Sequence, residues 1–156
     1  MTYIFVGEND LVKVIQTEQQ EMMSRLEDYL EVIYHLVQDK GYASTIDIAE
    51  SLGVKPPTVS YMLRRLAAKD YLVHEPYRGI RLTDKGEKVA RSVIARHSII
   101  SELLSMLGVE KETAYQDTEG IEHHVQPATI RRLEGLVDYL RKNPKLLDAI
   151  REHIEE

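Results

Sequence analysis

The 156-residue sequence contains no cysteine. This absence excludes a disulfide-stabilised scaffold, a zinc site built on thiolates and a cysteine-bound iron–sulfur cluster. Long hydrophobic runs are also absent, so the sequence predicts neither a transmembrane helix nor a secretory signal. The apolar stretch near the amino terminus is short and soon gives way to acidic residues. These features favour a cytoplasmic protein that does not act in a membrane.

Motifs of several enzyme classes are missing too. The sequence has no His-Glu-x-x-His zinc-protease motif or its inverse, no nucleophile elbow and no phosphate-binding loop. Low-complexity segments and internal repeats are likewise absent. The hydrophobic content of 43% is enough for the cores of one or two small domains. We therefore expect a globular protein that is not an enzyme and has no small organic substrate.

Charge is unevenly distributed along the chain. Residues 40–81 contain seven Lys or Arg and four Asp or Glu, a balance of +3, which leaves −9 for the rest of a chain whose net charge is −6. A basic segment suits phosphate groups, and an acidic remainder suits cations. The charge distribution is therefore compatible with a nucleic-acid partner, although the net charge of the chain is negative.

The segment from residue 44 to 70 has the pattern of a helix-turn-helix. Ser44 or Thr45 caps a short predicted helix that ends at Leu52, and Gly53 makes the turn. Two prolines then begin a second helix, where their missing N–H groups cost nothing. Apolar residues at helical spacing predict its buried face: Val59, Met62, Leu63 and Leu66.

Two short strands are predicted next, at 71–74 and 80–82, joined by a turn at residues 76–79. A hairpin directly after a recognition helix is a wing. A helix at about 21–38, ended by Gly41, precedes this motif, and its predicted apolar stripe comprises Leu26, Tyr29, Leu30, Ile33, Tyr34 and Val37. Thr83 caps a long helix that Gly108 ends.

Three more helical segments follow, at 111–126, 128–143 and 145–156. In the second of them Leu133, Leu136, Val137 and Leu140 form an apolar stripe that we expect a second subunit to cover. The predicted fold is mainly α, with three parts: an extension at 1–21, a winged helix-turn-helix domain at 22–83, and a helical metal-binding and dimerisation domain at 84–156. The extension either lengthens the first helix or forms an arm near DNA.

The outer face of the recognition helix and the wing supply candidate DNA contacts. The N-terminal residues of such a helix meet base edges, and flanking arginines meet phosphates. The candidates are Lys55, Pro57, Thr58, Ser60, Tyr61, Arg64, Arg65, Arg78 and Arg81. A winged-helix module used for protein contacts is the ordinary alternative.

The stretch DTEGIEHH, residues 117–124, gathers acidic and imidazole side chains. On one α-helix, Glu119, Glu122 and His123 share a face, and His124 points about 100° away. Two carboxylates and an imidazole on one face repel or compete unless a cation joins them. A solvated acidic face is the plainer interpretation.

Three predicted helices together offer four carboxylates and two imidazoles as metal ligands. The candidates are Asp28, Glu31, His97, Glu119, Glu122 and His123. A hard divalent ion such as manganese prefers this sulfur-free set. The sequence alone does not show whether these three helices lie close enough together to share one metal site. Surface charge would also explain the carboxylates of the first helix, and a core or interface position would explain His97.

Five blocks of the chain resemble, in the same order, the diphtheria toxin repressor family of metal-dependent regulators. They are LEDYLEVIYHL, GYASTIDIAESLGV, YLVHEPYRGIRLTDKG, ARH and DTEGIEHH. The resemblance runs from about Leu26 to Leu140. It implies that the six candidates are the family's metal ligands at matching positions, and that the chain binds DNA.

The resemblance also bears on which metal binds. The iron-sensing branch of the family carries methionine where this chain has Asp28 and cysteine where it has Glu119. Oxygen at both positions resembles the manganese-sensing branch, in which this ligand set holds two neighbouring ions. The implied cofactor is therefore Mn²⁺, with two ions per subunit. Fe²⁺, Zn²⁺, Co²⁺ and Cd²⁺ are further candidates, because intrinsic affinity rarely favours manganese.

The function implied is a manganese-activated repressor of manganese uptake genes. It would bind a palindromic operator in double-stranded DNA as a homodimer. Activation of an exporter gene is equally compatible with these residues. Other readings are an iron- or zinc-responsive regulator of the same family, a winged-helix regulator that senses no metal, and a metal-dependent hydrolase.

Overall fold

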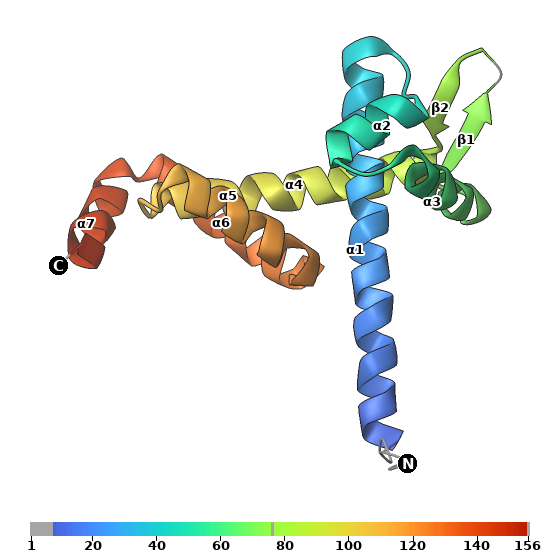
Figure 1. The fold of residues 1–156 in the computed structure, drawn as a ribbon. Coiled ribbons are helices and arrows are strands. Elements are labelled where there is room, and N and C mark those ends of the chain that lie inside the picture. Colours follow the sequence, from blue (N-terminus) through green and yellow to red (C-terminus); the bar gives the residue numbers. More distant parts are fainter. Residues whose placement is uncertain (1–7, 76, 156) are drawn as a thin grey trace. The chain divides into compact units, whose positions relative to one another are not determined.

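The computed structural model describes residues 8–75 and 77–155 (Figure 1). The chain divides into two compact units, with the division between Ala90 and Arg91. The described residues form mainly helices and one two-stranded hairpin, as the sequence predicts. Among these residues, no helix is both long and apolar enough to cross a membrane.

The first helix is longer than the periodic pattern alone predicts. Helix α1 spans Glu8–Lys40, so the part of the extension that the structure describes continues the helix. Residues 1–7 of the predicted extension lie outside the described part. Gly41 follows α1 with a φ of 83°, in the left-handed region that glycine adopts at low cost, and its N–H donates to the Val37 carbonyl. The predicted stop at Gly41 is confirmed.

The helix-turn-helix is present as predicted. Helix α2 spans Thr45–Leu52 and α3 spans Pro56–Ala68. Ser44 and Asp47 form a capping box at the start of α2, in which each side chain binds the other residue's backbone N–H. Gly53 ends α2 in the left-handed conformation, with a φ of 62°.

The hairpin is shifted by one residue from its predicted start. Strand β1 spans Leu72–Glu75 and pairs antiparallel with β2, Gly79–Leu82. Tyr71 was predicted in the first strand, but its N–H donates to the Leu66 carbonyl at the end of α3. Pro76, predicted in the turn, lies outside the described residues. The N–H of Ile80 donates to the Ala43 carbonyl, which attaches the hairpin to the segment between α1 and α2.

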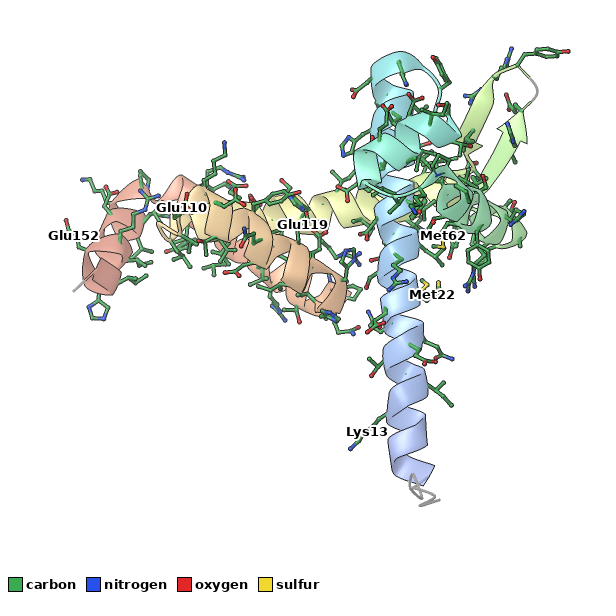
Figure 2. The ribbon with its side chains drawn as sticks, in the orientation of Figure 1. Lys13, Met22, Met62, Glu110, Glu119 and Glu152 are labelled. Carbon is green, nitrogen blue, oxygen red and sulfur yellow. The ribbon has the colours of Figure 1, made fainter. Side chains whose placement is uncertain are left out.

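The core of the first unit joins all of these elements. Tightly buried side chains come from α1, α2, α3, both strands and the start of α4: Leu26, Leu30, Ile33, Ile48, Val59, Leu66, Leu72, Ile80 and Ala90. Met62 of α3 is buried, and Met22 of α1 packs against this core (labelled in Figure 2). The predicted inner faces of α1 and α3 are therefore confirmed. This packing fixes the positions of α3 and the wing within the unit.

The second unit is built from the rest of a long helix and three shorter ones. Helix α4 spans Asp84–Met106, α5 Lys111–Ile121, α6 Pro127–Lys142 and α7 Pro144–Glu155. Polar contacts tie α6 and α7 to α4: Arg141 of α6 donates to both carboxylate oxygens of Glu102, at 2.7 and 2.8 Å. Arg151 of α7 donates to the Met106 carbonyl at 2.6 Å, one of the carbonyls that the end of α4 leaves unpaired.

The predicted apolar stripe of α6 is only partly buried. Val137 and Leu140 are each 2% exposed, Leu133 is partly exposed and Leu136 is 44% exposed.

Gly86, in the first turn of α4, leaves no space for a side chain. A Cβ at this position would lie 1.9 Å from the Tyr71 carbonyl oxygen, a backbone atom. We expect Gly86→Ala to lower the free energy of unfolding by about 3 kcal/mol, the upper range for overpacking. Gly135→Ala is the control, because nothing lies within 4 Å of its added Cβ. Urea unfolding of both variants tests this, and equal stability would contradict it.

Asp47 should make stability depend on pH. The Lys40 ammonium, 2.6 Å away, and the Ser44 hydroxyl hold the pKa of Asp47 below its ordinary value of 3.8. Because folding favours the charged carboxylate, this contribution is present above pH 3.8 and lost as the pH falls through the lower folded value. We expect the Tm difference between wild type and Asp47→Asn to shrink below about pH 4 in thermal melts. A difference that stays constant down to about pH 2 would refute this.

Candidate metal centre and nucleic-acid interface

The polar face of α3 is open to solvent. Lys55 occupies the N-cap position, and the exposed residues along the helix are Pro57, Thr58, Ser60, Tyr61 and Arg64. Arg65 is partly exposed. Its guanidinium donates to the Tyr61 hydroxyl at 3.3 Å and lies 5.8 Å from the centre of the Tyr61 ring. The structure therefore places seven of the nine candidate DNA contacts on one helix.

The other two candidates lie on the wing. Arg78 is 3.9 Å and Arg81 3.8 Å from the same Glu75 carboxylate oxygen. Ion pairs this exposed contribute little, about 0–1 kcal/mol, so both guanidiniums are available to another anion at low cost. Tyr77 at the wing tip is fully exposed and has a φ of 66°.

Three of the six predicted metal ligands meet in the second unit. His97 comes from the middle of α4, Glu119 from α5 (Figure 2) and Glu122 from the turn that follows α5. His97 Nδ1 lies 2.9 Å from Glu122 Oε2 and 3.2 Å from Glu119 Oε1. One ligand atom from each of the three lies within 4.8 Å of the others.

The backbone at Glu122 differs from the expected continuous α-helix. Helix α5 ends at Ile121, and Glu122–His124 form a 3₁₀ turn. The chain then leaves the helical conformation at Val125, which is extended with a ψ of 126°, before Pro127 begins α6. A 3₁₀ turn is a common way for a helix to end. The change does not separate Glu119 from Glu122.

Burial distinguishes the two carboxylates. The side chain of Glu122 is 1% exposed, whereas that of Glu119 is 45% exposed. Burying a carboxylate costs free energy unless hydrogen bonds or an opposite charge compensate it. Glu122 receives such contacts from two imidazoles, His97 and His123, the second at 3.5 Å.

The donor set fits a divalent cation. His97 Nδ1 faces two carboxylates, but one ring nitrogen carries at most one proton and can donate to one oxygen at a time. A cation among these atoms would accept electron pairs from the imidazole nitrogen and both oxygens together. Oxygen and imidazole donors suit Mn²⁺ and also other first-row divalent ions.

Of the other three candidate ligands, His123 lies beside Glu122 and two lie in the other unit. Asp28 and Glu31 are partly buried residues of α1, one helical turn apart. Glu31 Oε1 lies 3.7 Å from His35 Nε2, an imidazole that the sequence analysis did not select. An i, i+4 spacing of Glu and His was the signal that could have found this pair.

The sequence analysis overlooked two further neighbours of the candidate sites. The Tyr115 ring lies edge-on to that of His97, with centroids 6.1 Å apart. On the wing, His74 of β1 is exposed and lies directly opposite Ile80. Side chains alternate between the two faces of a strand, so the sequence could have shown that His74 lies on the same face as the buried Leu72.

Models of one family match nearly the whole chain. Residues 21–80 match "Iron dependent repressor, N-terminal DNA binding domain". Residues 83–149 match "Iron dependent repressor, metal binding and dimerisation domain".

Similar proteins carry names consistent with these models. The chain is 43% identical over 127 residues to the HTH-type transcriptional regulator MntR of Geobacillus kaustophilus (strain HTA426), covering 81% of this chain and 90% of that protein. It is also 43% identical to the MntR of Bacillus subtilis (strain 168) over 118 residues, covering 76% of this chain and 83% of that one.

Among solved structures, the manganese regulator SloR matches with a TM-score of 0.66 and 30% identity. The match covers 73% of this chain and 54% of SloR, so the chain spans about half of that protein. The apo form of the manganese-activated repressor ScaR matches with a TM-score of 0.63 and 32% identity, covering 72% of this chain and 54% of that chain.

Substitution of the buried carboxylate tests the metal centre. With Mn²⁺ at about 100 times its Kd, we expect the wild-type chain to gain roughly 2.7 kcal/mol of stability. Glu122→Gln should remove most of this gain, because a neutral amide is a poor ligand for a hard ion. Glu134→Gln on the exposed surface of α6 is the matched control. Thermal melts with and without Mn²⁺ measure the gain, and an equal gain in Glu122→Gln would rule out a role for this carboxylate.

Proposed function

The chain belongs to the iron-dependent repressor family, also called the diphtheria toxin repressor family, and is a metal-dependent transcriptional repressor; we propose that manganese activates it. The observation that carries this proposal is the meeting of His97, Glu119 and Glu122 in a set without sulfur. Relatives named MntR and the structural neighbours SloR and ScaR support the choice of metal. An iron- or zinc-responsive regulator is the alternative within the family.

The proposed ligand set has six members and holds two ions. They are Asp28, Glu31, His97, Glu119, Glu122 and His123. Four carboxylates would offset the charge of two divalent ions. Asp28 and Glu31 belong to the unit that carries the helix-turn-helix, and the other four belong to the second unit. Ligands drawn from both units would make DNA affinity depend on metal.

The proposed carboxylate ligands can themselves make DNA binding depend on metal. Without compensation, the clustered carboxylates repel one another and disfavour the arrangement that binds DNA. The ion, when bound, supplies the positive charge that removes this repulsion. By thermodynamic linkage, operator DNA must then increase metal affinity by the same factor by which metal increases DNA affinity.

We assign DNA binding to residues 22–83, and metal binding and dimerisation to residues 84–156, with residues 1–21 as an extension. The exposed face of α3 would enter the major groove, where Arg64 is suited to a bidentate contact with guanine. Lys55, Pro57, Thr58, Ser60 and Tyr61 are its other proposed contacts on that face. Arg65, Arg78 and Arg81 would contact phosphates.

A homodimer on a palindromic operator is part of the proposal. The second unit matches a dimerisation domain. It also exposes large apolar side chains that a second copy would cover: Tyr115, Ile121, Leu136, Tyr139, Leu146 and Ile154. We further propose that the protein acts in the cytoplasm, represses manganese uptake genes and has no catalytic role.

DNA binding with and without metal tests the function. We expect the purified chain to bind the DNA upstream of its own gene, or of a manganese transporter gene, tightly with Mn²⁺ and weakly with chelator. Salt must be fixed, because phosphate contacts alone make affinity salt-dependent. His97→Ala should lose the response to Mn²⁺. Because His97 also compensates the buried carboxylate of Glu122, circular dichroism must first establish that this variant is folded. His153→Ala, an exposed histidine of α7, should respond like wild type. Equal binding with metal and with chelator would leave a winged-helix DNA binder that senses no metal.

A further inference from the structure

His74 lies on the inner side of the wing. Directly opposite residues of an antiparallel pair point to the same face, and His74 pairs with Ile80, which is 2% exposed. Val73 and Arg81, the neighbouring pair, therefore point to the outer face. His74 is exposed even though it shares a face with buried residues, so it occupies an open place between the wing and the helices.

Two adjoining surface hollows meet at this place. One lies between the wing and the turn from α1 to α2, and the other between the wing and α3. Thr45, His74 and Ile80 line both of them. Together the hollows form a trough that runs between the recognition helix and the hairpin.

The rim of the trough is mainly basic. Its cations are Lys40 from the end of α1, Arg64 from α3 and Arg78 from the wing. The nearby acids are Asp47 and Glu75, and both are paired: Asp47 with Lys40, and Glu75 with the two wing arginines. The hydroxyls of Ser44, Thr45 and Ser60, together with the phenols of Tyr42 and Tyr77, complete its polar lining.

This charge and position fit one strand of the DNA backbone. A recognition helix enters the major groove, and the sugar–phosphate ridge separates that groove from the next. A trough beside the helix and under the wing is where the ridge would lie. Resting on the DNA-binding function proposed above, we propose that His74 contacts a backbone phosphate in this trough and makes operator affinity depend on pH.

The sign of the pH effect follows from the charge of the imidazole. Only the protonated ring carries a positive charge toward the phosphate, and histidine ordinarily changes charge between pH 5 and 8. A protonated His74 also makes a charge-assisted hydrogen bond, which is stronger than a neutral one. His74 therefore strengthens binding at the acidic end of this range and contributes little at the alkaline end.

Comparison of variants at each pH isolates this contribution. The ratio of Kd between His74→Gln and wild type at one pH cancels every pH effect that the two proteins share, including any effect at the proposed metal site. At saturating Mn²⁺ we expect a ratio of roughly three- to tenfold at about pH 6 and near one at about pH 8. The slope of log affinity against log salt at about pH 6 should fall by about 0.9, as for one lost phosphate contact.

Two further variants make the test specific. His74→Lys, which carries a permanent charge, should keep wild-type affinity at about pH 6 and exceed it at about pH 8. His153→Gln should match wild type at both values. Because phosphates carry no sequence information, His74→Gln should lower the affinity for a scrambled duplex by the same factor as the affinity for the operator.

The outcomes separate this proposal from the function it rests on. Metal-dependent operator binding with equal affinity of wild type and His74→Gln at both pH values overturns the role of His74 alone. Loss of binding in His74→Gln that His74→Lys does not rescue means a structural role and also overturns it. Failure of the wild-type chain to bind any duplex overturns the proposed function as well.

Discussion

The buried carboxylate of Glu122 is the constraint on which the second unit depends. An ionised group removed from water must be compensated, and the strongest compensation here comes from His97 on α4. This contact fixes the end of α5 against α4. It also fixes where Glu119 lies, because Glu119 stands only three residues earlier, near the end of α5. The geometry of the candidate metal centre therefore follows from the burial of one carboxylate, that of Glu122.

Among the described residues of the first unit, no charged side chain is comparably buried. Its core is apolar, and the hydrogen bond from Ile80 to Ala43 joins the hairpin to the helices. The residues proposed to contact DNA all lie outside this core. Polar substitutions on the outer face of α3 should therefore alter binding with little effect on folding, whereas the ligand positions of the second unit link binding to stability.

Much of the fold follows from local rules that act over a few residues. The capping box at Ser44, the prolines that begin α3 and the glycines that follow α1 and α2 are visible in the sequence, because each has one favourable backbone conformation. Apolar spacing also gives the buried faces of α1 and α3. Apolar spacing does not predict the exposure of Leu136, because that exposure depends on which helices pack beside α6.

Three of the six predicted ligands meet in the structure, but the geometry in which they meet was not predictable from the sequence. Residue chemistry and order indicated His97, Glu119 and Glu122, which the structure brings together. The 3₁₀ turn at Glu122 replaces the last turn of the expected α-helix. The difference in burial between the two glutamates is a property of tertiary packing. Periodicity over so short a segment cannot reveal it.

The difference in burial between Glu119 and Glu122 has a consequence for evolution. A ligand on the surface can change its chemistry without disturbing the fold, whereas a ligand in the interior is held in place by everything packed around it. Glu119, at 45% exposed, is free to vary in this sense, and Glu122, at 1%, is not. The iron-sensing branch described above carries cysteine at the position of Glu119. Divergence in metal preference would then begin at the solvent-facing ligand, with the buried one retained as a fixed anchor.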